Sequence, residues 1–516
     1  MNEGRINKVI RNTKYAIFMK FTETILAFLL RTIFVRTLST VYLGINGVFS
    51  NILTVLCLMD LGVMSAISFT LYKPLVENDK LKINLLMNLF KKLYRNIGIL
   101  ICLIGFCLTP FLDFILTLPE DLPNIYIIYW LNIGNTAITY FLAYKRILLI
   151  ADQKAYIDYR ISLVFKITRF FALSIVLIVF HNFILYLALD ILNTFLCNLV
   201  ASMQVSKMYP FLKEKLNSKL PKQEKDNLWK YMKAGVLNKV GQTVVTSTDN
   251  IIISTFISTV TVGLYSNYLL IISGVETCIF MLFSSITSSV GNLSASKDVE
   301  IKKTKEVFEN LSVVNHIIST VSCVGLVSLL NPFIQLWLGD KYLLSQSVVI
   351  ICVINLYIQL NMNSISNFMG ARGDMYYINR YRPLFEAVIN LVASVLLVKY
   401  TDLGIIGVFL GTTISFFFGR LWMDARTLYK YWFNEPFINY IKDYIFKFLI
   451  TVSISIVCFF ICDTILSFTE NNVIIFMGLI ALTVLNSTIA LFCVYNRNPS
   501  FIYILNIIKR KIRLVK

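Results

Sequence analysis

The chain has 516 residues, of which 57% are hydrophobic and only 15% are charged. Soluble domains typically carry about 25% charged residues, so this composition excludes a set of ordinary soluble domains. The formal net charge is +19. Such a charge suits either nucleic acid or an anionic membrane surface, and the placement of the basic residues decides between these partners.

The apolar residues fall in runs of roughly 20, the length with which an α-helix crosses a hydrocarbon core of about 30 Å. These runs predict an all-α polytopic membrane protein with about 14 transmembrane helices. The predicted spans lie at about 15–35, 44–69, 96–117, 122–144, 161–180, 183–205, 234–256, 261–290, 311–331, 343–368, 384–400, 404–425, 443–463 and 472–494.

The basic residues indicate an orientation, because cytoplasmic connections of membrane proteins collect Lys and Arg. Of the 48 Lys and Arg residues, 42 are assigned to alternating segments on one side, three to the intervening loops and three to the spans. The 42 lie in the N-terminal segment, in the C-terminal tail and in the stretches 73–95, 145–169, 207–233, 297–305, 372–382 and 420–447. Both termini are therefore predicted to be cytoplasmic, and the positive charge requires no nucleic-acid partner.

An internal repeat is visible in the sequence. The stretch Leu38–Gly44 (LSTVYLG) matches Ile257–Gly263 (ISTVTVG), and the same shift along the chain carries Lys20 onto Lys239. Transporter folds are often built from such repeats, with the substrate site between them. We expect two pseudo-symmetric six-helix bundles at 1–210 and 234–431, a basic cytoplasmic linker at 211–233, two additional transmembrane helices at 432–496 and a basic cytoplasmic tail at 497–516.

Polar and charged residues inside the apolar spans are the candidates for a functional site, since a charge at the membrane centre costs about 2.5–3.5 kcal/mol. In the first span, the spacing of Lys20, Glu23 and Arg31 places all three on one helical face. Lys and Arg are the usual phosphate ligands, so this face suits an anionic head group. The predicted substrate-binding residues are Arg31, Lys20, Lys239, Asn51, Tyr265, Asn267 and Tyr268. The predicted sites for a coupling H⁺ or Na⁺ are Glu23, Asp60, Asp249 and Glu276.

Each of these candidates has a structural alternative. Lys20 could extend its ammonium group to the inner interface of the membrane. Arg31 and Glu23 could form a structural ion pair, and Asp60 and Glu276 could be neutral acids hydrogen-bonded between helices.

The sequence shows few residues that could carry out catalysis or bind a cofactor. The chain has only two histidines, and its ten cysteines lie in or beside apolar spans without metal-ligand spacing. We therefore expect no cofactor other than a coupling ion and no enzymatic activity.

Several motifs resemble one known family across almost the whole chain. In the first half they are Arg31–Arg36 (RTIFVR), Tyr42–Asn51 (YLGINGVFSN), Asp60–Gly62 (DLG) and Leu71–Pro74 (LYKP). In the second half they are Thr248–Ser254 (TDNIIIS) and Val262–Tyr268 (VGLYSNY). These stretches resemble the polysaccharide flippases of O-antigen and capsule repeat units, within the multidrug/oligosaccharidyl-lipid/polysaccharide (MOP) exporter superfamily. Asp60 stands where we expect Glu in many relatives.

The resemblance implies a flippase that moves undecaprenyl-diphosphate-linked oligosaccharide repeat units to the outer leaflet for capsular or other surface polysaccharide. It implies alternating access of two bundles around a cationic cavity, coupled to an ion gradient, in a bacterial plasma membrane. The expected partners are the lipid-linked oligosaccharide, the bilayer, and the polysaccharide polymerase and glycosyltransferases of the same pathway.

Two other functions stay open at this point. A cation-coupled multidrug exporter of the same superfamily should prefer an acidic cavity, and the basic residues in the spans speak against it. A membrane glycosyltransferase or polysaccharide polymerase needs an external acid, for which the sequence offers Asp113, Glu120 and Asp121.

Overall fold

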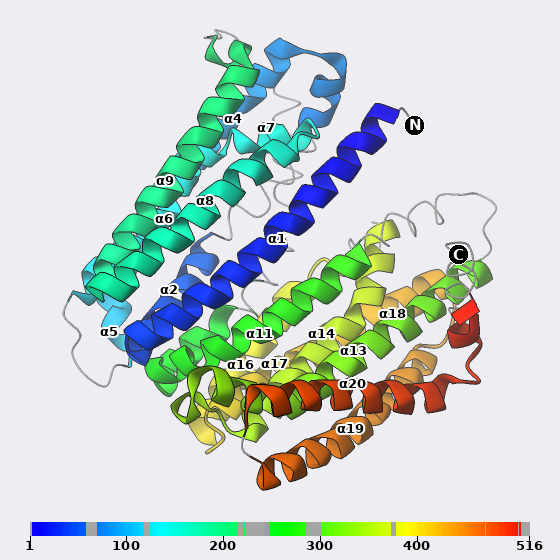
Figure 1. Ribbon diagram of the computed structural model, residues 1–516. Coiled ribbons are helices and arrows are strands. Elements are labelled where there is room, and N and C mark those ends of the chain that lie inside the picture. Colours follow the sequence, from blue (N-terminus) through cyan, green and yellow to red (C-terminus); the bar gives the residue numbers. More distant parts are fainter. Residues whose placement is uncertain are drawn as a thin grey trace. The chain divides into compact units, whose positions relative to one another are not determined.

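The structure is a computed structural model that describes residues 3–57, 70–117, 124–214, 221, 243, 245, 247–284, 301–372, 378–469, 471–503 and 505–506. Within these ranges the regular elements are all helical and there is no β-strand (Figure 1). Ten helices of the described part are long and apolar enough to cross a membrane, which confirms an all-α polytopic membrane protein. The number 14 is not tested, because the predicted spans 44–69, 234–256 and 261–290 lie partly outside the described residues.

The chain divides into two compact units, Met1–Gly263 and Leu264–Lys516. The first unit contains α1 (Glu3–Thr37), α2 (Thr40–Leu56), α4 (Lys80–Leu108), η1 (Thr109–Phe111), α5 (Leu112–Ile115), α6 (Ile125–Ala143), α7 (Arg146–Ala151), α8 (Ala155–Ile175), the π-helical turn η2 (Val176–Phe180), α9 (Phe183–Met208) and η3 (Pro210–Lys213). A further helix covers 247–256, and α11 (Thr259–Ser284) begins in this unit.

Helix starts in this unit follow from local sequence. Asp79 precedes α4 and its carboxylate accepts a hydrogen bond from the Lys82 backbone N–H, at 2.9 Å. Asn182 does the same for α9, accepting from the Leu185 N–H at 3.0 Å. Each cap satisfies a backbone donor that the first helical turn leaves without a partner.

The second unit contains the rest of α11 and, in its described part, ten further elements. They are α13 (Ile301–Leu338), η4 (Asp340–Tyr342), α14 (Gln346–Arg372), α16 (Arg382–Tyr400), α17 (Ile405–Phe416), the π-helical η5 (Phe417–Asp424), α18 (Ala425–Leu428), the π-helical η6 (Tyr429–Phe433), α19 (Phe437–Phe468) and α20 (Val473–Tyr495). Helix α14 is the most buried of the ten apolar helices, since α13 and α17 pack on it.

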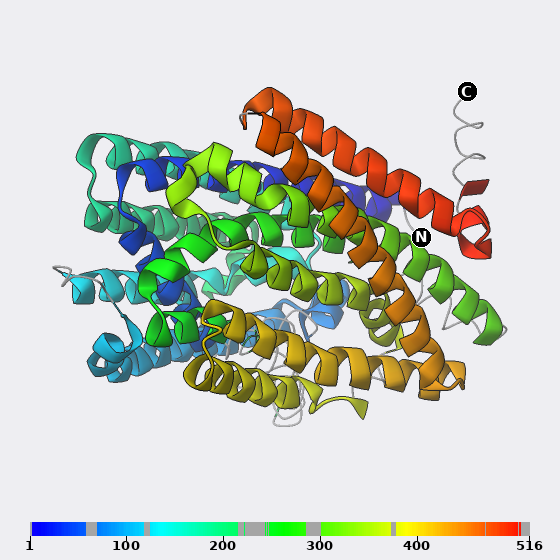
Figure 2. The same ribbon diagram turned by 90° about the horizontal axis from the view of Figure 1, so that it is seen from below.

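The same order of neighbouring helices occurs in both units. In the first unit α4 packs on α6, α6 on α9 and α9 on α8; in the second, α13 packs on α14, α14 on α17 and α17 on α16. Figure 2 shows α16 and α17 side by side. This agreement supports an internal duplication. The predicted boundaries of the bundles remain a prediction, because residues 222–242 lie outside the described part.

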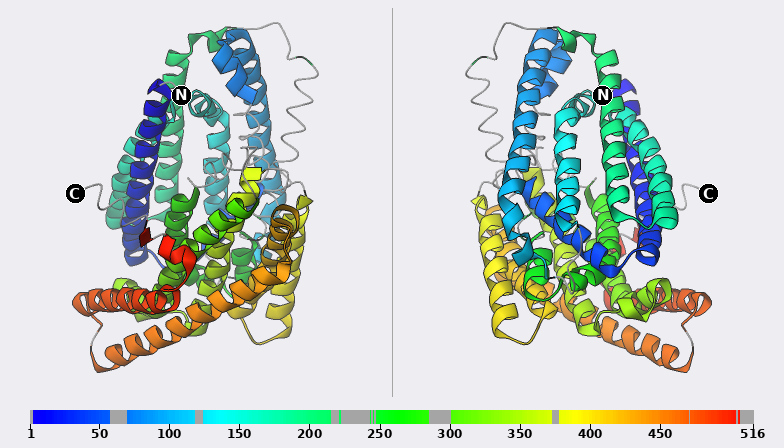
Figure 3. Two further views of the ribbon diagram at one scale, coloured as in Figure 1. Left: turned by 90° about the vertical axis from the view of Figure 1, so that its right-hand side faces the viewer. Right: turned by 90° about the vertical axis from the view of Figure 1, so that its left-hand side faces the viewer.

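Other helices of each unit stand outside this common order. In the first unit, α1 packs along α8, while α2 contacts α6 (Figure 1). In the second unit, the last two helices, α19 and α20, pack on α13 and on each other (Figure 3).

The two repeated turns contact each other within the first unit. A Cβ atom added at Gly44 would lie 1.9 Å from the backbone oxygen of Thr259, and one added at Gly263 would lie 2.5 Å from the backbone oxygen of Thr40. The repeat relates Thr40 to Thr259 and Gly44 to Gly263, so the contact is reciprocal, as at a two-fold axis. Only glycine allows the two backbones to approach this closely.

Candidate functional site

Helix α1 lies parallel to α8, and polar contacts fix the register of the pair. Near the start of α8, the Asn12 side-chain amide donates to the backbone oxygen of Gln153 and accepts from the backbone N–H of Tyr156, both at 3.0 Å. Further along both helices, Glu23 pairs with Lys166. The partners are 141, 144 and 143 residues apart, and this near-constant separation shows that the helices run in the same direction.

Glu23 contacts two lysines, one on its own helix and one on α8. Its Oε2 lies 3.6 Å from the Nζ of Lys20, and its Oε1 accepts a hydrogen bond from the Nζ of Lys166. The side chains of Lys20, Glu23 and Lys166 are 40%, 36% and 31% exposed. Lys166 lies about 16 Å along α8 from Ala155, at 1.5 Å per residue. Charged side chains inside apolar helices usually face the interior of the bundle or a water-filled cavity.

A second ion pair lies one helical turn further along α8. Arg169 donates two hydrogen bonds to the Asp190 carboxylate on α9, one of them 3.0 Å from Nη2 to Oδ2. The Asn135 amide on α6 donates to the same carboxylate at 3.3 Å. The Asp190 side chain is only 12% exposed, and its carboxylate accepts hydrogen bonds from both Arg169 and Asn135. Arg31 on α1 lies near Tyr186, which is also on α9.

We call Lys20, Glu23, Arg31, Lys166, Arg169 and Asp190 the α1–α8 array. It contains four cations and two carboxylates. Its excess of positive charge is what an anionic ligand requires. The structure therefore brings three predicted residues, Lys20, Glu23 and Arg31, into one charged surface of the first unit.

Three members of the array are absent from the predicted site, namely Lys166, Arg169 and Asp190. The charge pattern of the sequence assigns Lys166 and Arg169 to the cytoplasmic stretch 145–169, whereas the structure places both well inside α8. The signal that could have found them is their position within the predicted span 161–180. A cation inside the membrane costs free energy wherever it occurs. Lys166 and Arg169 are therefore candidates for the site on the same ground as Lys20.

A separate ion pair joins α7, α8 and α9 near the start of α8. Arg146 donates to both carboxylate oxygens of Asp158, at 2.6 and 2.9 Å, and also to Asn198 and Ser162. Burial acts to lower the pKa of Arg146, but the hydrogen bonds and charge of Asp158 outweigh it and raise the pKa above its ordinary value. This guanidinium is held by four hydrogen bonds, which indicates a structural role.

The other predicted residues of the first unit are more dispersed. The Asn51 side chain donates to the Gly47 backbone oxygen of its own helix at 2.8 Å. Asp249 is half-buried in the helix 247–256. Lys239 and Asp60 lie outside the described residues, so their predicted roles stay predictions.

The predicted residues of the second unit lie on α11. The Tyr265 ring packs 4.7 Å from that of Phe409, and Asn267 is buried. The Tyr268 hydroxyl donates to Asn331 Oδ1 at 2.6 Å and accepts from the Leu344 N–H at 2.9 Å. These bonds tie α11 to α13 and to the start of α14. A substrate-binding role for these three residues stays a prediction.

Glu276, the fourth predicted residue on α11, lies near the guanidinium of Arg420 in η5. Arg420 belongs to a buried group of four charges that the sequence reasoning missed. Its Nε donates to Glu386 at 2.8 Å; Arg382 pairs with the same carboxylate and, at 3.1 Å, with Asp424. We call Arg382, Glu386, Arg420 and Asp424 the α16–η5 cluster; its side chains are only 2–16% exposed.

The signal for this cluster was the occurrence of Glu386 and Asp424 inside the predicted spans 384–400 and 404–425. Its two cations and two carboxylates balance each other. Part of the cluster lies on a π-helical segment, a feature that often marks functional positions. The cluster is buried and balanced, and its ion pairs join α16 to η5.

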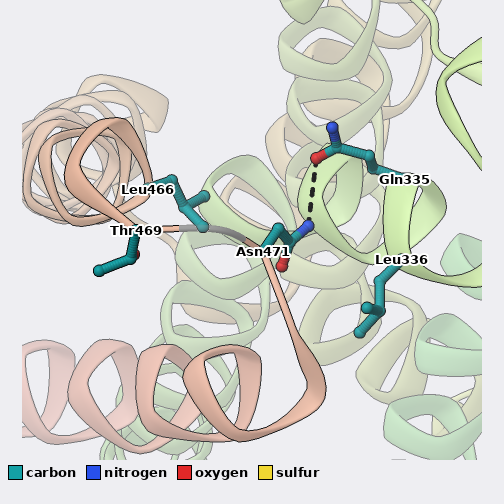
Figure 4. Close-up of a pocket in the computed structure, with 5 residues that line it drawn as sticks. All are labelled: Gln335, Leu336, Leu466, Thr469 and Asn471. Carbon is teal, nitrogen blue, oxygen red and sulfur yellow. Dashed lines mark hydrogen bonds between the residues drawn. The ribbon is translucent and has the colours of Figure 1, made fainter.

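Two cavities lie in the second unit. One of about 490 Å³ is lined by Gln335, Leu336, Leu466, Thr469 and Asn471, with an Asn471–Gln335 hydrogen bond of 3.1 Å (Figure 4). The other, of about 210 Å³, has apolar walls from α13, α14 and α19, including Val327, Ile354 and Phe459. No predicted site residue lines either cavity.

Metal ligands do not gather in the described part of the chain, where no group of three or more His, Cys, Asp or Glu residues could hold a metal ion. Asp113, one of the acids that a glycosyltransferase could use, accepts hydrogen bonds from the Tyr126 hydroxyl at 3.1 Å. Glu120 and Asp121 lie outside the described residues.

No protein-family model matches this chain, and no curated protein sequence matches it significantly. Several solved structures are similar in fold. The lipid II flippase MurJ in its inward closed conformation is 15% identical, with a TM-score of 0.64 over 94% of this chain and 99% of the other. An inward-facing multidrug resistance MATE family transporter of the MOP superfamily is 15% identical, with a TM-score of 0.63 over 78% of this chain and 94% of the other.

A third similar structure is a MOP superfamily transporter from Pyrococcus furiosus Vc1, described by the reverse polarity of its binding pocket. It is 14% identical, with a TM-score of 0.55 over 82% of this chain and 96% of the other. At these identities the likeness concerns the fold alone. The chain is a multi-pass membrane protein with the fold of the MOP superfamily transporters.

Proposed function

We propose that this protein is a flippase that moves undecaprenyl-diphosphate-linked oligosaccharide repeat units from the cytoplasmic to the outer leaflet of a bacterial plasma membrane. The fold supports transport as the general activity, since the similar structures are transporters and include a lipid II flippase. The product would be used for capsular or other surface polysaccharide, in a pathway with glycosyltransferases and a polymerase.

The observation that carries this proposal is the α1–α8 array. Lys20, Glu23 and Lys166 lie within helical segments, stay about one-third exposed and belong to an array with an excess of cations. Lys and Arg bind phosphate through charge-assisted hydrogen bonds, so a diphosphate is the ligand chemistry that fits best. A pocket for cationic drugs would need the opposite balance of charge.

The second unit, taken by itself, contains an apolar cavity. The cavity of about 210 Å³ between α13, α14 and α19 is lined largely by aliphatic and aromatic side chains, among them Ile350, Ile456 and Phe460. These three side chains are 41–62% exposed, so at the surface of apolar helices they meet lipid. Such a groove is compatible with a prenyl or acyl chain.

In the proposed cycle, the protein alternates between states open to either side while Lys20, Arg31 and Lys166 hold the diphosphate. Lys239 would add a cation from the repeat-related position. An H⁺ or Na⁺ gradient would bias the cycle through Glu23, Asp60, Asp249 or Glu276. A ligand that binds one state more tightly than the other can drive such a change only by that difference in affinity.

The proposal is tested by depleting the protein in its host and measuring undecaprenyl-linked glycans by mass spectrometry, with an external glycosidase to report their sidedness. A flippase predicts complete repeat units that accumulate where the glycosidase cannot reach them. Truncated glycans would instead indicate a glycosyltransferase, and complete units accessible from outside would indicate a polymerase. An unchanged lipid pool would overturn the proposal and favour a multidrug exporter.

A further inference from the structure

We infer that Glu23 is a displaceable counter-ion, whose carboxylate occupies the position between Lys20 and Lys166 that an anionic group of the ligand takes during binding. This inference rests on the proposed function for the nature of the ligand, a phosphate or diphosphate group. It assigns to Glu23 a direct part in setting the affinity of the site.

The geometry of Glu23 resembles that of a bound anion. One carboxylate oxygen faces Lys20 at 3.6 Å and the other accepts a hydrogen bond from Lys166. The two ammonium groups therefore converge on one negative group from two helices. The carboxylate offsets the repulsion between these two like charges.

The Glu23 carboxylate is more exposed than two carboxylates of the first unit that pair with arginine instead of lysine. Asp158 and Asp190 are 11% and 12% exposed, and each accepts two hydrogen bonds from one guanidinium. Glu23 is 36% exposed and is held by lysines, which are flexible single-point donors. A ligand can reach the Glu23 group, whereas Asp158 and Asp190 are enclosed.

The charge balance favours exchange. Lys20 and Lys166 carry two positive charges and Glu23 supplies one negative charge, so the trio keeps a net charge of one. A diphosphate supplies at least two negative charges and more acceptor oxygens, so it satisfies the two lysines better than one carboxylate. Arg169 lies within electrostatic range of Glu23, so the displaced carboxylate keeps a cation nearby.

Competition by an internal anion has a consequence for transport. It weakens the binding of the ligand by the free energy needed to displace Glu23, and it speeds release because the carboxylate can return to the lysines. A flippase must release its substrate as well as bind it. Glu23 therefore lowers the affinity for the ligand and raises the rate at which the ligand is released.

The test measures the affinity of inorganic pyrophosphate for the full-length protein in lipid nanodiscs by isothermal titration calorimetry. Glu23→Gln removes the competing charge and is expected to bind pyrophosphate about tenfold more tightly than the wild type. Lys166→Gln in the same assay should weaken binding about tenfold. Equal or weaker binding by a folded Glu23→Gln variant would overturn the inference.

The control for a general effect of charge is Glu77→Gln. Glu77 forms an exposed pair with Lys73 at 3.8 Å in the same unit, so its removal changes the net charge equally without touching the array. Its affinity should equal that of the wild type, and a gain equal to that of Glu23→Gln would also overturn the inference. Should Glu23→Gln fail to fold, Glu23→Asp is the second variant, because it keeps the charge but shortens the reach of the carboxylate. It is expected to bind pyrophosphate more tightly than the wild type, by less than about tenfold. Unchanged or weaker affinity would count against the inference.

The inference and the proposed function can fail separately. Tighter pyrophosphate binding by Glu23→Gln with an unchanged pool of lipid-linked glycans on depletion would keep the counter-ion and discard the flippase. Trapped glycans on depletion with no gain in affinity would keep the flippase and discard the counter-ion.

Discussion

The α1–α8 array of the first unit and the α16–η5 cluster of the second use the same residue types for different purposes. In the cluster, two arginines and two carboxylates balance, and Glu386 is only 2% exposed. In the array, cations outnumber carboxylates, and Glu23 is 36% exposed. Charges that are buried and balanced join helices, whereas charges that are exposed and unbalanced at membrane depth are available to a ligand.

The largest expected effect comes from removing a carboxylate of the cluster. Glu386→Ala leaves Arg382 and Arg420, which are 16% and 11% exposed, without a shared partner. We expect a loss of about 3–5 kcal/mol in stability, because the remaining charges stay buried. Thermal unfolding of the purified protein measures it. Glu23→Gln in the array should cost under about 1 kcal/mol. A larger loss of stability for Glu23→Gln than for Glu386→Ala would show that the array holds the fold together more than the cluster does.

A second prediction concerns Gly44 and Gly263, which serve the packing of the first unit and are not members of the array. Gly44→Ala and Gly263→Ala should each cost about 1–3 kcal/mol or more, because the new methyl group meets a backbone oxygen within 2.5 Å. Gly274→Ala is the matched control on α11, since a Cβ there meets nothing within 4 Å. The reciprocal contact predicts similar losses at both positions, and a neutral result at either one would contradict it.

A third prediction asks whether the array acts on transport rather than on stability. Lys166→Gln should lower the rate of repeat-unit translocation at least about tenfold, the effect of losing one charge-assisted hydrogen bond of about 1.4 kcal/mol. Its Tm should stay within about 2 °C of the wild type, because Lys166 is 31% exposed. Lys73→Gln, at a side chain that is 79% exposed, is the control and should change neither quantity.

The smallest expected effect concerns Lys145, between α6 and α7. Burial, together with the charges of Lys91 and Lys213, lowers the pKa of this ammonium group. A lowered pKa in the folded state means that the charged form opposes folding below that pKa, and that stability rises as pH increases through it. Lys145→Gln should therefore raise Tm slightly at pH 7 and reduce its rise at alkaline pH. A lower Tm would show that the hydrogen bond from Lys145 to Ser206, at 2.7 Å, matters more.

The helices were predictable because apolar runs of membrane-spanning length leave few alternatives. The described parts of the predicted spans are helical except for a few residues at their ends. The repeat at Gly44 and Gly263 was also visible in the sequence. Its reciprocal contact was not, since a sequence repeat does not say that its two copies touch.

The partners of the charged residues could not be predicted, because pairing depends on the packing of helices that are distant in sequence. Helical spacing placed Lys20 and Glu23 on one face, but it could not show that Lys166, 143 residues later, faces Glu23. For the same reason nothing distinguished the buried Glu386 from the exposed Glu23. The helix α8 also shows that a basic stretch next to a span can continue into it, which a count of loop charges overlooks.

We propose that the α1–α8 array binds an anionic lipid-linked glycan during its movement across the membrane. The most direct measurement replaces the protein in its host by the double variant Lys20→Gln/Lys166→Gln, confirms its level in the membrane, and determines the sidedness of complete undecaprenyl-linked repeat units with an external glycosidase. Complete units that accumulate protected from the enzyme, as they would in the depleted strain, are the predicted result. Normal export of repeat units by this variant would show that the array does not bind the transported glycan.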